Sequence, residues 1–154
     1  MELIDILSSR AVVPSLNATS KKRLLQEIAQ TAETVYGLSS KEVFIAMQER
    51  ELLGPTGMGN GIAIPHARIA GTDSVKGIFV KLDKPVEYES VDHQPVDIVF
   101  ALFAPKGAGA EHLKALARVS RTLRNPDICA KLRSSDDAAV LYAILSSDQA
   151  SKAA

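Results

Sequence analysis

An unbroken apolar run from Ile98 to Ala104 constrains the fold of this chain more than any other stretch. A strand with one face in water alternates apolar and polar residues, so a strand without alternation needs cover on both faces. The run is also too short to cross a bilayer as a helix. We therefore expect a central strand over Val96 to Phe103, with helices packed on both faces of its sheet.

The segments around this strand predict the other elements. Apolar residues at helical spacing predict helices, and short runs rich in β-branched residues predict strands. The first helix is expected to begin near Thr19 or Ser20 and to stop at Gly37, and the second to run from Ser39 to Gly54. Three more helices are expected over about 110–124, 126–132 and 137–145, and strands over 11–14, where Pro14 suggests an edge, 62–66 and 77–82. The resulting order, β-α-α-β-β-β-α-α-α, is typical of an α/β fold, a three-layer α/β/α sandwich around a mixed β-sheet.

The length of 154 residues suits one compact domain that folds without disulfides or metals. We expect this domain to cover residues 1–146. Residues 147–154 are mostly serine, alanine and lysine, which offer little to pack, so we expect them to form a flexible C-terminal tail.

Charge and cysteine content narrow the class of protein. Lys plus Arg and Asp plus Glu both number 18, so no net charge attracts nucleic acid, and we expect no nucleic-acid partner. Cys129 is the only cysteine, which excludes an internal disulfide and favours a reducing compartment. The N-terminus has no export signal and no segment is long enough for membrane insertion, so we expect a cytoplasmic protein.

Four glycines in eight positions, from Gly54 to Gly61, follow the second predicted helix. Glycine permits positive φ angles and exposes successive N–H groups, which is typical of an anion-binding loop, although a tight connection would need the same glycines. A dinucleotide fingerprint and a P-loop are both excluded, because the segment leads from a helix into a strand and no Lys-Ser or Lys-Thr follows. We expect no cofactor. A phosphate-binding loop would use Thr56, Gly57, Gly59 and Asn60.

Three polar residues are predicted to turn inward. His66 ends the strand that begins at Ile62 and would project from that end, unless it is an ordinary hydrogen-bonded histidine. Arg50 follows Met47 by three positions on the apolar stripe of its helix, so it needs an anionic partner unless its head reaches water. His112 lies on the core-facing stripe in the first turn of its helix, where the dipole favours a neutral ring, although a plain core histidine is the alternative.

The third histidine, His93, follows Asp92 in a polar loop and is predicted to lie on the surface. A zinc site built from His66, His93 and His112 would need spacings of 27 and 19 residues, which match no compact zinc pattern. We therefore expect no metal.

The stretch from Arg50-Glu51 through Gly54 to His66 resembles the active-site signature of the mannitol/fructose-type IIA components of the bacterial phosphotransferase system (PTS). Residues 102–105, 111–113 and 123–126 resemble a second block of its nitrogen-regulatory branch, and the resemblance runs from Ile4 to Leu145. Pro55 departs from the family pattern, in which a small polar residue is more usual, and it removes an N–H donor beside Thr56.

The resemblance implies a phosphocarrier rather than a free-standing turnover enzyme. His66 would accept the phosphoryl group on Nε2, giving a tele-phosphohistidine, with His112 as supporting histidine and Arg50 stabilising the phosphoryl group. The donor would be a histidine phosphocarrier protein, HPr or its nitrogen-branch equivalent. The phosphorylation state would then regulate target proteins in nitrogen- and potassium-related metabolism.

Two other functions remain open for a chain with this pattern. A IIA component with the same site could donate its phosphoryl group to a IIB protein in fructose- or mannitol-type sugar uptake. An interaction module could keep the fold without phosphotransfer, but the presence of Arg50, His66 and His112 together disfavours it.

Overall fold

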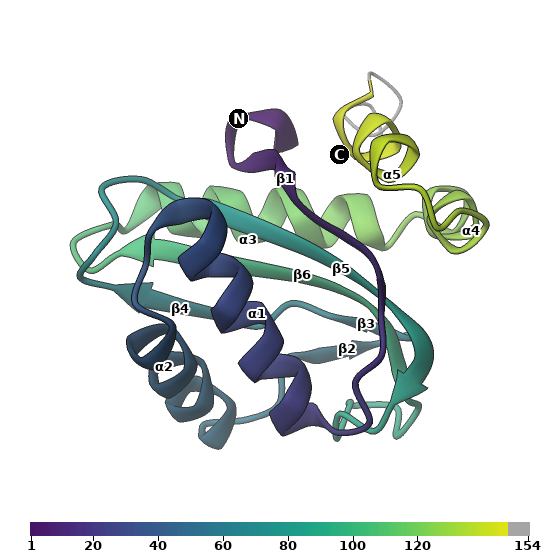
Figure 1. Cartoon of the computed structure of the whole chain (residues 1–154), viewed down its shortest axis with the longest axis horizontal. Coiled ribbons are helices and arrows are strands. Elements are labelled where there is room, and N and C mark those ends of the chain that lie inside the picture. Colours follow the sequence, from purple (N-terminus) through teal and green to yellow (C-terminus); the bar gives the residue numbers. More distant parts are fainter. Residues whose placement is uncertain (148–154) are drawn as a thin grey trace.

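A mixed sheet forms the middle layer of the computed structural model, which describes residues 1–147 (Figure 1). The strands run in the order β1-β5-β6-β3-β2, and β4 also pairs with β6. The elements are η1 (Leu3–Asp5), β1 (Leu7–Leu16), α1 (Lys21–Tyr36), α2 (Ser40–Leu52), β2 (Gly57–Gly59), β3 (Ile62–Ala63), β4 (His66–Ile69), β5 (Lys76–Val86), β6 (Val96–Pro105), α3 (Ala110–Leu123), α4 (Pro126–Arg133) and α5 (Ala138–Ser146).

Strand β6 is the centre of the sheet. Every residue from Ile98 to Ala104 is 0% exposed. The strand pairs antiparallel with β5 along one edge and parallel with β3 and β4 along the other. Helices α1 and α2 cover one face of the sheet and α3 covers the opposite face (Figure 1). The predicted central strand and the three-layer α/β/α fold are confirmed.

The predicted helix boundaries are also confirmed, because side-chain caps mark them. Ser20 accepts a hydrogen bond from the N–H of Arg23 at the start of α1, and Ser39 accepts one from Glu42 at the start of α2. Gly37 ends α1 in the left-handed conformation, with φ of 70°. Such caps satisfy N–H groups that have no partner inside the helix.

Strand β1 is longer than the sequence predicts. Only residues 11–14 carry a clear strand pattern, yet β1 runs from Leu7 to Leu16, because Leu7 already pairs in parallel with Gly77 of β5. The strand lies at the edge of the sheet, as Pro14 predicts, and its register with β5 shifts between Val13 and Leu16.

The prediction of a continuous strand from Ile62 to His66 is wrong. The segment forms β3 and β4 along the same edge of β6, separated at Ile64 and Pro65. Proline has no N–H to donate to a sheet, so the pairing is interrupted there. His66 is consequently the first residue of β4 rather than the last residue of a strand.

The glycine-rich segment forms a β-hairpin. Strand β2 pairs antiparallel with β3, and the turn between them consists of Asn60 and Gly61 with φ of 57° and 79°. Two successive positive φ angles at Asn-Gly are typical of a tight hairpin turn. Asp92 accepts a hydrogen bond from the N–H of Asn60, and Arg133 donates one to the carbonyl of Asn60. The tip is therefore held by the protein itself.

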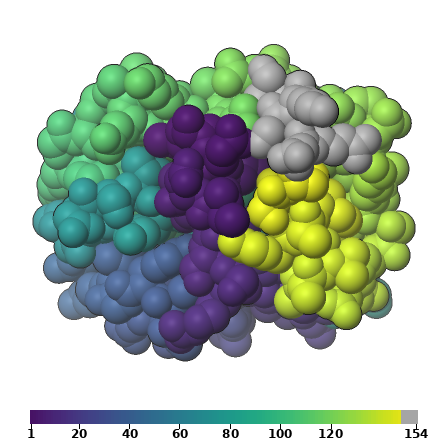
Figure 2. Space-filling view, turned by 90° about the horizontal axis from the view of Figure 1, so that it is seen from above, coloured from purple at the N-terminus to yellow at the C-terminus, as the bar shows by residue number. Residues whose placement is uncertain are grey.

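The two ends of the described chain lie together. Figure 2 shows the N-terminal segment against α5, and η1 and β1 both contact that helix. Ser147 ends α5, and the rest of the predicted tail of residues 147–154 lies outside the described residues. None of the helices within residues 1–147 has the length and apolar character needed to cross a membrane.

The close packing of the hairpin against the loop before β6 gives a test of the fold. A Cβ at Gly57 would lie 2.9 Å from the backbone Cα of Ser90, closer than real packing permits. We expect Gly57→Ala to reduce the free energy of unfolding by about 1–3 kcal/mol in urea denaturation. Gly107→Ala is the control, since no atom lies within 4 Å of its Cβ, and it should change stability by less than about 0.5 kcal/mol. Equal effects would contradict the packing described here.

Candidate active site

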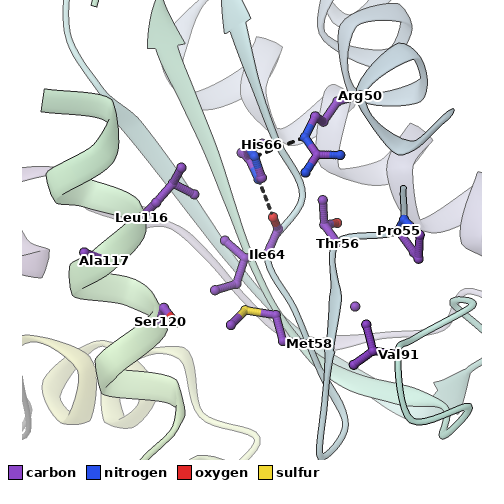
Figure 3. A pocket seen from close by; sticks show the side chains of 11 residues that line it. Arg50, Pro55, Thr56, Met58, Ile64, His66, Val91, Leu116, Ala117 and Ser120 are labelled. Atoms are coloured by element: carbon purple, nitrogen blue, oxygen red, sulfur yellow. Dashed lines mark hydrogen bonds between the residues drawn. The ribbon is translucent and has the colours of Figure 1, made fainter. Parts of the chain in front are cut away.

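Arg50, His66 and His112 come together from three elements. Arg50 lies in the last turn of α2, His66 begins β4, and His112 lies in the first turn of α3. His66 and Arg50 line a cavity of about 520 Å³ (Figure 3) and also a neighbouring cavity of about 510 Å³, which His112 joins. The structure thus brings the three residues together, as their positions in the sequence predict.

His66 is held as a single neutral tautomer. Its Nδ1 lies 2.8 Å from the carbonyl oxygen of Ile64, and because a carbonyl only accepts, Nδ1 carries the proton and donates it. On the other side of the ring, Nε of Arg50 lies 3.3 Å from Nε2 (Figure 3), and a guanidinium only donates, so Nε2 carries the lone pair. Burial lowers the pKa of His66, and the charge of Arg50 also lowers it, against the opposing effect of the Ile64 carbonyl.

Arg50 is half-buried and has no carboxylate partner within residues 1–147. Its Nη1 donates to the carbonyl of Gly54 at 2.9 Å, and its Nε faces His66. Arg50 is absent from the ion pairs found among residues 1–147. The anionic partner that the sequence calls for is therefore not supplied by the described part of the chain. A guanidinium in this state presents a planar set of donors suited to an anion.

His112 is buried, with 6% of its surface exposed, beside His66. The two rings meet edge to face, with centroids 5.6 Å apart and an angle of 72° between planes. Nδ1 of His112 lies 3.5 Å from Nε of Arg68, and Nε2 is buried without a hydrogen-bond partner among the described residues. Burial lowers the pKa of His112, and so do His66 and Arg68, which keeps the ring neutral.

The residues of the predicted phosphate loop separate into two groups. Thr56 and Gly57 line the larger cavity together with Pro55 (Figure 3). Gly59 and Asn60 line neither cavity at His66, because they belong to the far end of the hairpin, where Asp92 binds Asn60. The structure thus brings only the first part of the segment to His66.

Sequence reasoning missed a buried polar cluster that holds the loop after Arg50. The Glu51 carboxylate, whose side chain is 6% exposed, accepts hydrogen bonds from the N–H and hydroxyl of Thr56 and pairs with Lys21 at 3.1 Å. The Thr56 hydroxyl also lies 3.1 Å from the Tyr88 hydroxyl, and burial, together with the nearby Glu51 charge, raises the pKa of Tyr88. Glu51 could have been suspected from its place beside Arg50, but Lys21 and Tyr88 come from distant segments.

The surface around His66 is mostly apolar. The larger cavity is also lined by Met58, Ile64, Val91 and Leu116. At the end of α2, Leu52 and Leu53 are 86% and 85% exposed. Large apolar side chains gathered around a polar centre are typical of a protein-binding surface. His93 is exposed as predicted, and within residues 1–147 no group of three or more potential ligands could hold a metal ion.

Comparison with known proteins identifies the family. A family profile described as phosphoenolpyruvate-dependent sugar phosphotransferase system, EIIA 2, matches residues 5–148. The chain belongs to this family.

Individual relatives refine the assignment within the EIIA 2 family. A nitrogen regulatory protein of Bradyrhizobium diazoefficiens is 47% identical over 145 residues, covering 94% of this chain and 95% of the relative. The crystal structure of the nitrogen regulatory protein IIA-Ntr of Neisseria meningitidis superposes with a TM-score of 0.86 at 35% identity, covering 92% of this chain and 97% of that one. The fructose-specific EIIABC component of Bacillus subtilis is 31% identical over 83% of this chain but only 20% of its own length. The predicted resemblance to the nitrogen-regulatory branch is confirmed.

The lowered pKa values of His66 and His112 predict how stability depends on pH. In the unfolded chain a histidine takes up a proton near pH 6.5, whereas in the folded protein these two remain neutral to lower pH. Because the unfolded state then binds more protons, the free energy of unfolding falls as the pH drops below about 6.5. Above that pH the contribution of the two histidines to stability is complete.

Urea denaturation at pH 7.5 and at pH 5.5 measures this effect. The loss of stability between the two pH values should be smaller for the double variant with His66→Gln and His112→Gln than for the wild type. An equal loss in the two proteins would contradict the buried neutral state of both rings.

Proposed function

We propose that this chain is a phosphocarrier that accepts a phosphoryl group on Nε2 of His66. The observation that carries the proposal is the pair of contacts that fix this nitrogen. Ile64 holds the proton on Nδ1, and the guanidinium of Arg50, which forms no ion pair within residues 1–147, lies at Nε2. A neutral imidazole with its lone pair beside a guanidinium is equipped to attack phosphorus, because the donors of Arg50 lie next to the atom that receives the negatively charged group.

The reaction is a direct transfer between two histidines. The lone pair of His66 Nε2 attacks the phosphorus, and the P–N bond to the donor breaks, leaving its electron pair on the donor ring. Nδ1 of His66 keeps its proton on the Ile64 carbonyl, so the phosphorylated ring carries positive charge and remains a good leaving group for the next transfer. Such transfers depend on positioning and charge stabilisation more than on covalent chemistry.

Arg50 and His112 would bind the phosphoryl oxygens. Arg50 would turn its donors from Nε2 of His66 and from the Gly54 carbonyl toward this group. His112 would contribute its Nε2–H, which has no hydrogen-bond partner among the described residues. Thr56 and Gly57, which line the cavity, are further candidates for contact. Phosphorylation would add a charge of roughly −1.5 to −2 within an apolar surface, which changes the partners that fit there.

We favour regulation over sugar uptake as the use of this phosphoryl group. The relatives matched over nearly their whole length at 47% and 35% identity carry the name nitrogen regulatory protein. By that analogy the partners are a histidine phosphocarrier as donor and regulated target proteins, in nitrogen- and potassium-related metabolism. The buried, unpaired Cys129 fits the reducing cytoplasm, where we propose the chain acts. Sugar uptake through a IIB protein stays the second candidate, because a fructose-specific component shares 31% identity.

Phosphorylation can be tested directly with purified proteins. Incubation with phosphoenolpyruvate and the general phosphotransferase proteins should produce one acid-labile, base-stable adduct, located on His66 by mass spectrometry. His66→Ala should remain unmodified, and His93→Ala, at an exposed position, should be modified like the wild type. No adduct on His66 would refute the phosphocarrier function. A IIB protein added afterwards should leave the adduct in place, whereas rapid discharge would favour sugar uptake.

The role of Arg50 predicts a loss of rate without a loss of fold. Arg50→Gln should slow phosphorylation of His66 by about 10²–10³-fold, the usual effect of removing one donor that stabilises a developing charge. Rapid-quench measurement of the phosphorylated fraction gives the rate. Arg23→Gln, at an exposed helical arginine paired with Glu27, is the matched control and should react normally. A normal rate in Arg50→Gln would exclude its proposed role.

A further inference from the structure

Arg68 is an exposed residue of β4 whose guanidinium contacts an imidazole rather than a carboxylate. It lies two residues after His66 on the same face of the strand. Glu49 lines the same cavity, yet Arg68 is absent from the ion pairs within residues 1–147. Its Nε instead lies 3.5 Å from Nδ1 of His112. Within residues 1–147, Arg68 therefore faces the buried ring of His112 and forms no ion pair with Glu49.

The contact has a chemical consequence for His112. A guanidinium has donors only, so Nδ1 of His112 must be the acceptor and the ring proton must lie on Nε2. That Nε2 is buried and has no partner among the described residues. A buried donor without a partner costs free energy, which is regained when an acceptor enters the site.

The position of His112 beside His66 indicates which acceptor would enter the site. The His112 ring lies 5.6 Å from the His66 ring, centroid to centroid, and both rings line one cavity with Arg50 and Arg68. Both cavities at His66 have a mostly apolar lining, but within the described residues the smaller one also brings the side chains of Arg68 and His112 to His66. A phosphoryl group attached to His66 is rich in acceptor oxygens and would meet these donors.

We propose that Arg68 is a positioning residue for phosphotransfer, which occupies Nδ1 of His112 and so keeps the supporting histidine as the neutral Nε2–H donor. The inference rests on the proposed function of His66. Arg68 acts through His112 and does not itself touch the reacting nitrogen. With Arg68 removed, Nδ1 becomes free to take a proton, either as the other tautomer or as the cation, and the ring is no longer held in one state.

Nuclear magnetic resonance of the ring nitrogens reads this state without any phosphotransfer. In wild-type protein with ¹⁵N-labelled histidine at pH 7.5, Nδ1 of His112 should give the signal of an unprotonated nitrogen and Nε2 that of a protonated one. Arg68→Ala should shift the Nδ1 signal toward the protonated value, and Arg68→Lys, which keeps a charged donor, should restore it. Arg10→Ala, at an exposed arginine of β1, is the matched control and should leave the spectrum unchanged.

The rate of His66 phosphorylation is the second readout on the same four proteins. Arg68→Ala should react about tenfold more slowly, the effect of losing one charged hydrogen bond, with partial recovery in Arg68→Lys. A wild-type spectrum with the proton on Nδ1 of His112 overturns the proposal. The proposal is also overturned if the Arg68→Ala variant is phosphorylated more slowly but its His112 signals equal those of the wild type, because Arg68 would then act without His112.

The two proposals fail in different ways. If wild-type His66 is never phosphorylated, the proposed function is refuted, and with it the role of Arg68 in transfer, while the ring-nitrogen spectrum still reports whether Arg68 sets the state of His112. If wild-type His66 is phosphorylated and Arg68→Ala matches it in rate and spectrum, only the inference about Arg68 is refuted.

Discussion

The interruption of strand pairing at Ile64 and Pro65 determines the geometry of the site. Strands β3 and β4 follow one edge of the buried strand β6, and Pro65 has no N–H with which to continue the ladder. The carbonyl of Ile64 accepts the Nδ1 proton of His66 at this break. Because β6 is covered on both faces, the break is fixed in a rigid frame, and the orientation of the His66 ring is fixed with it.

The same frame brings charge to the ring from the two outer layers. Helix α2 supplies Arg50 from one side and α3 supplies His112 from the other, so His66 lies between a cation and a neutral donor. Both histidines are kept neutral by burial, and each has its tautomer specified by a neighbour that can only accept or only donate. Such an arrangement of donors around a neutral ring is chemically suited to an anion.

Much of the architecture could be predicted from local patterns. The helix caps at Ser20 and Ser39 and the apolar run in β6 act over a few residues, and the structure has them as expected. The Asn60-Gly61 turn lies in the glycine-rich segment, whose sequence fits both an anion-binding loop and a tight connection, and the structure contains the tight connection at these two residues. The cluster of Lys21, Glu51 and Tyr88 could not be predicted, since its members meet only after folding.

The sequence by itself determined the family, the layer order and the three candidate site residues, because periodicity, capping and the motif around His66 are local properties of the chain. Only the tertiary structure decided the tautomer of each ring. A tautomer depends on which atoms lie within hydrogen-bond distance of the ring. Arg50 contacts His66 across 16 residues of sequence, and Arg68 contacts His112 across 44, so both contacts form only in the folded protein.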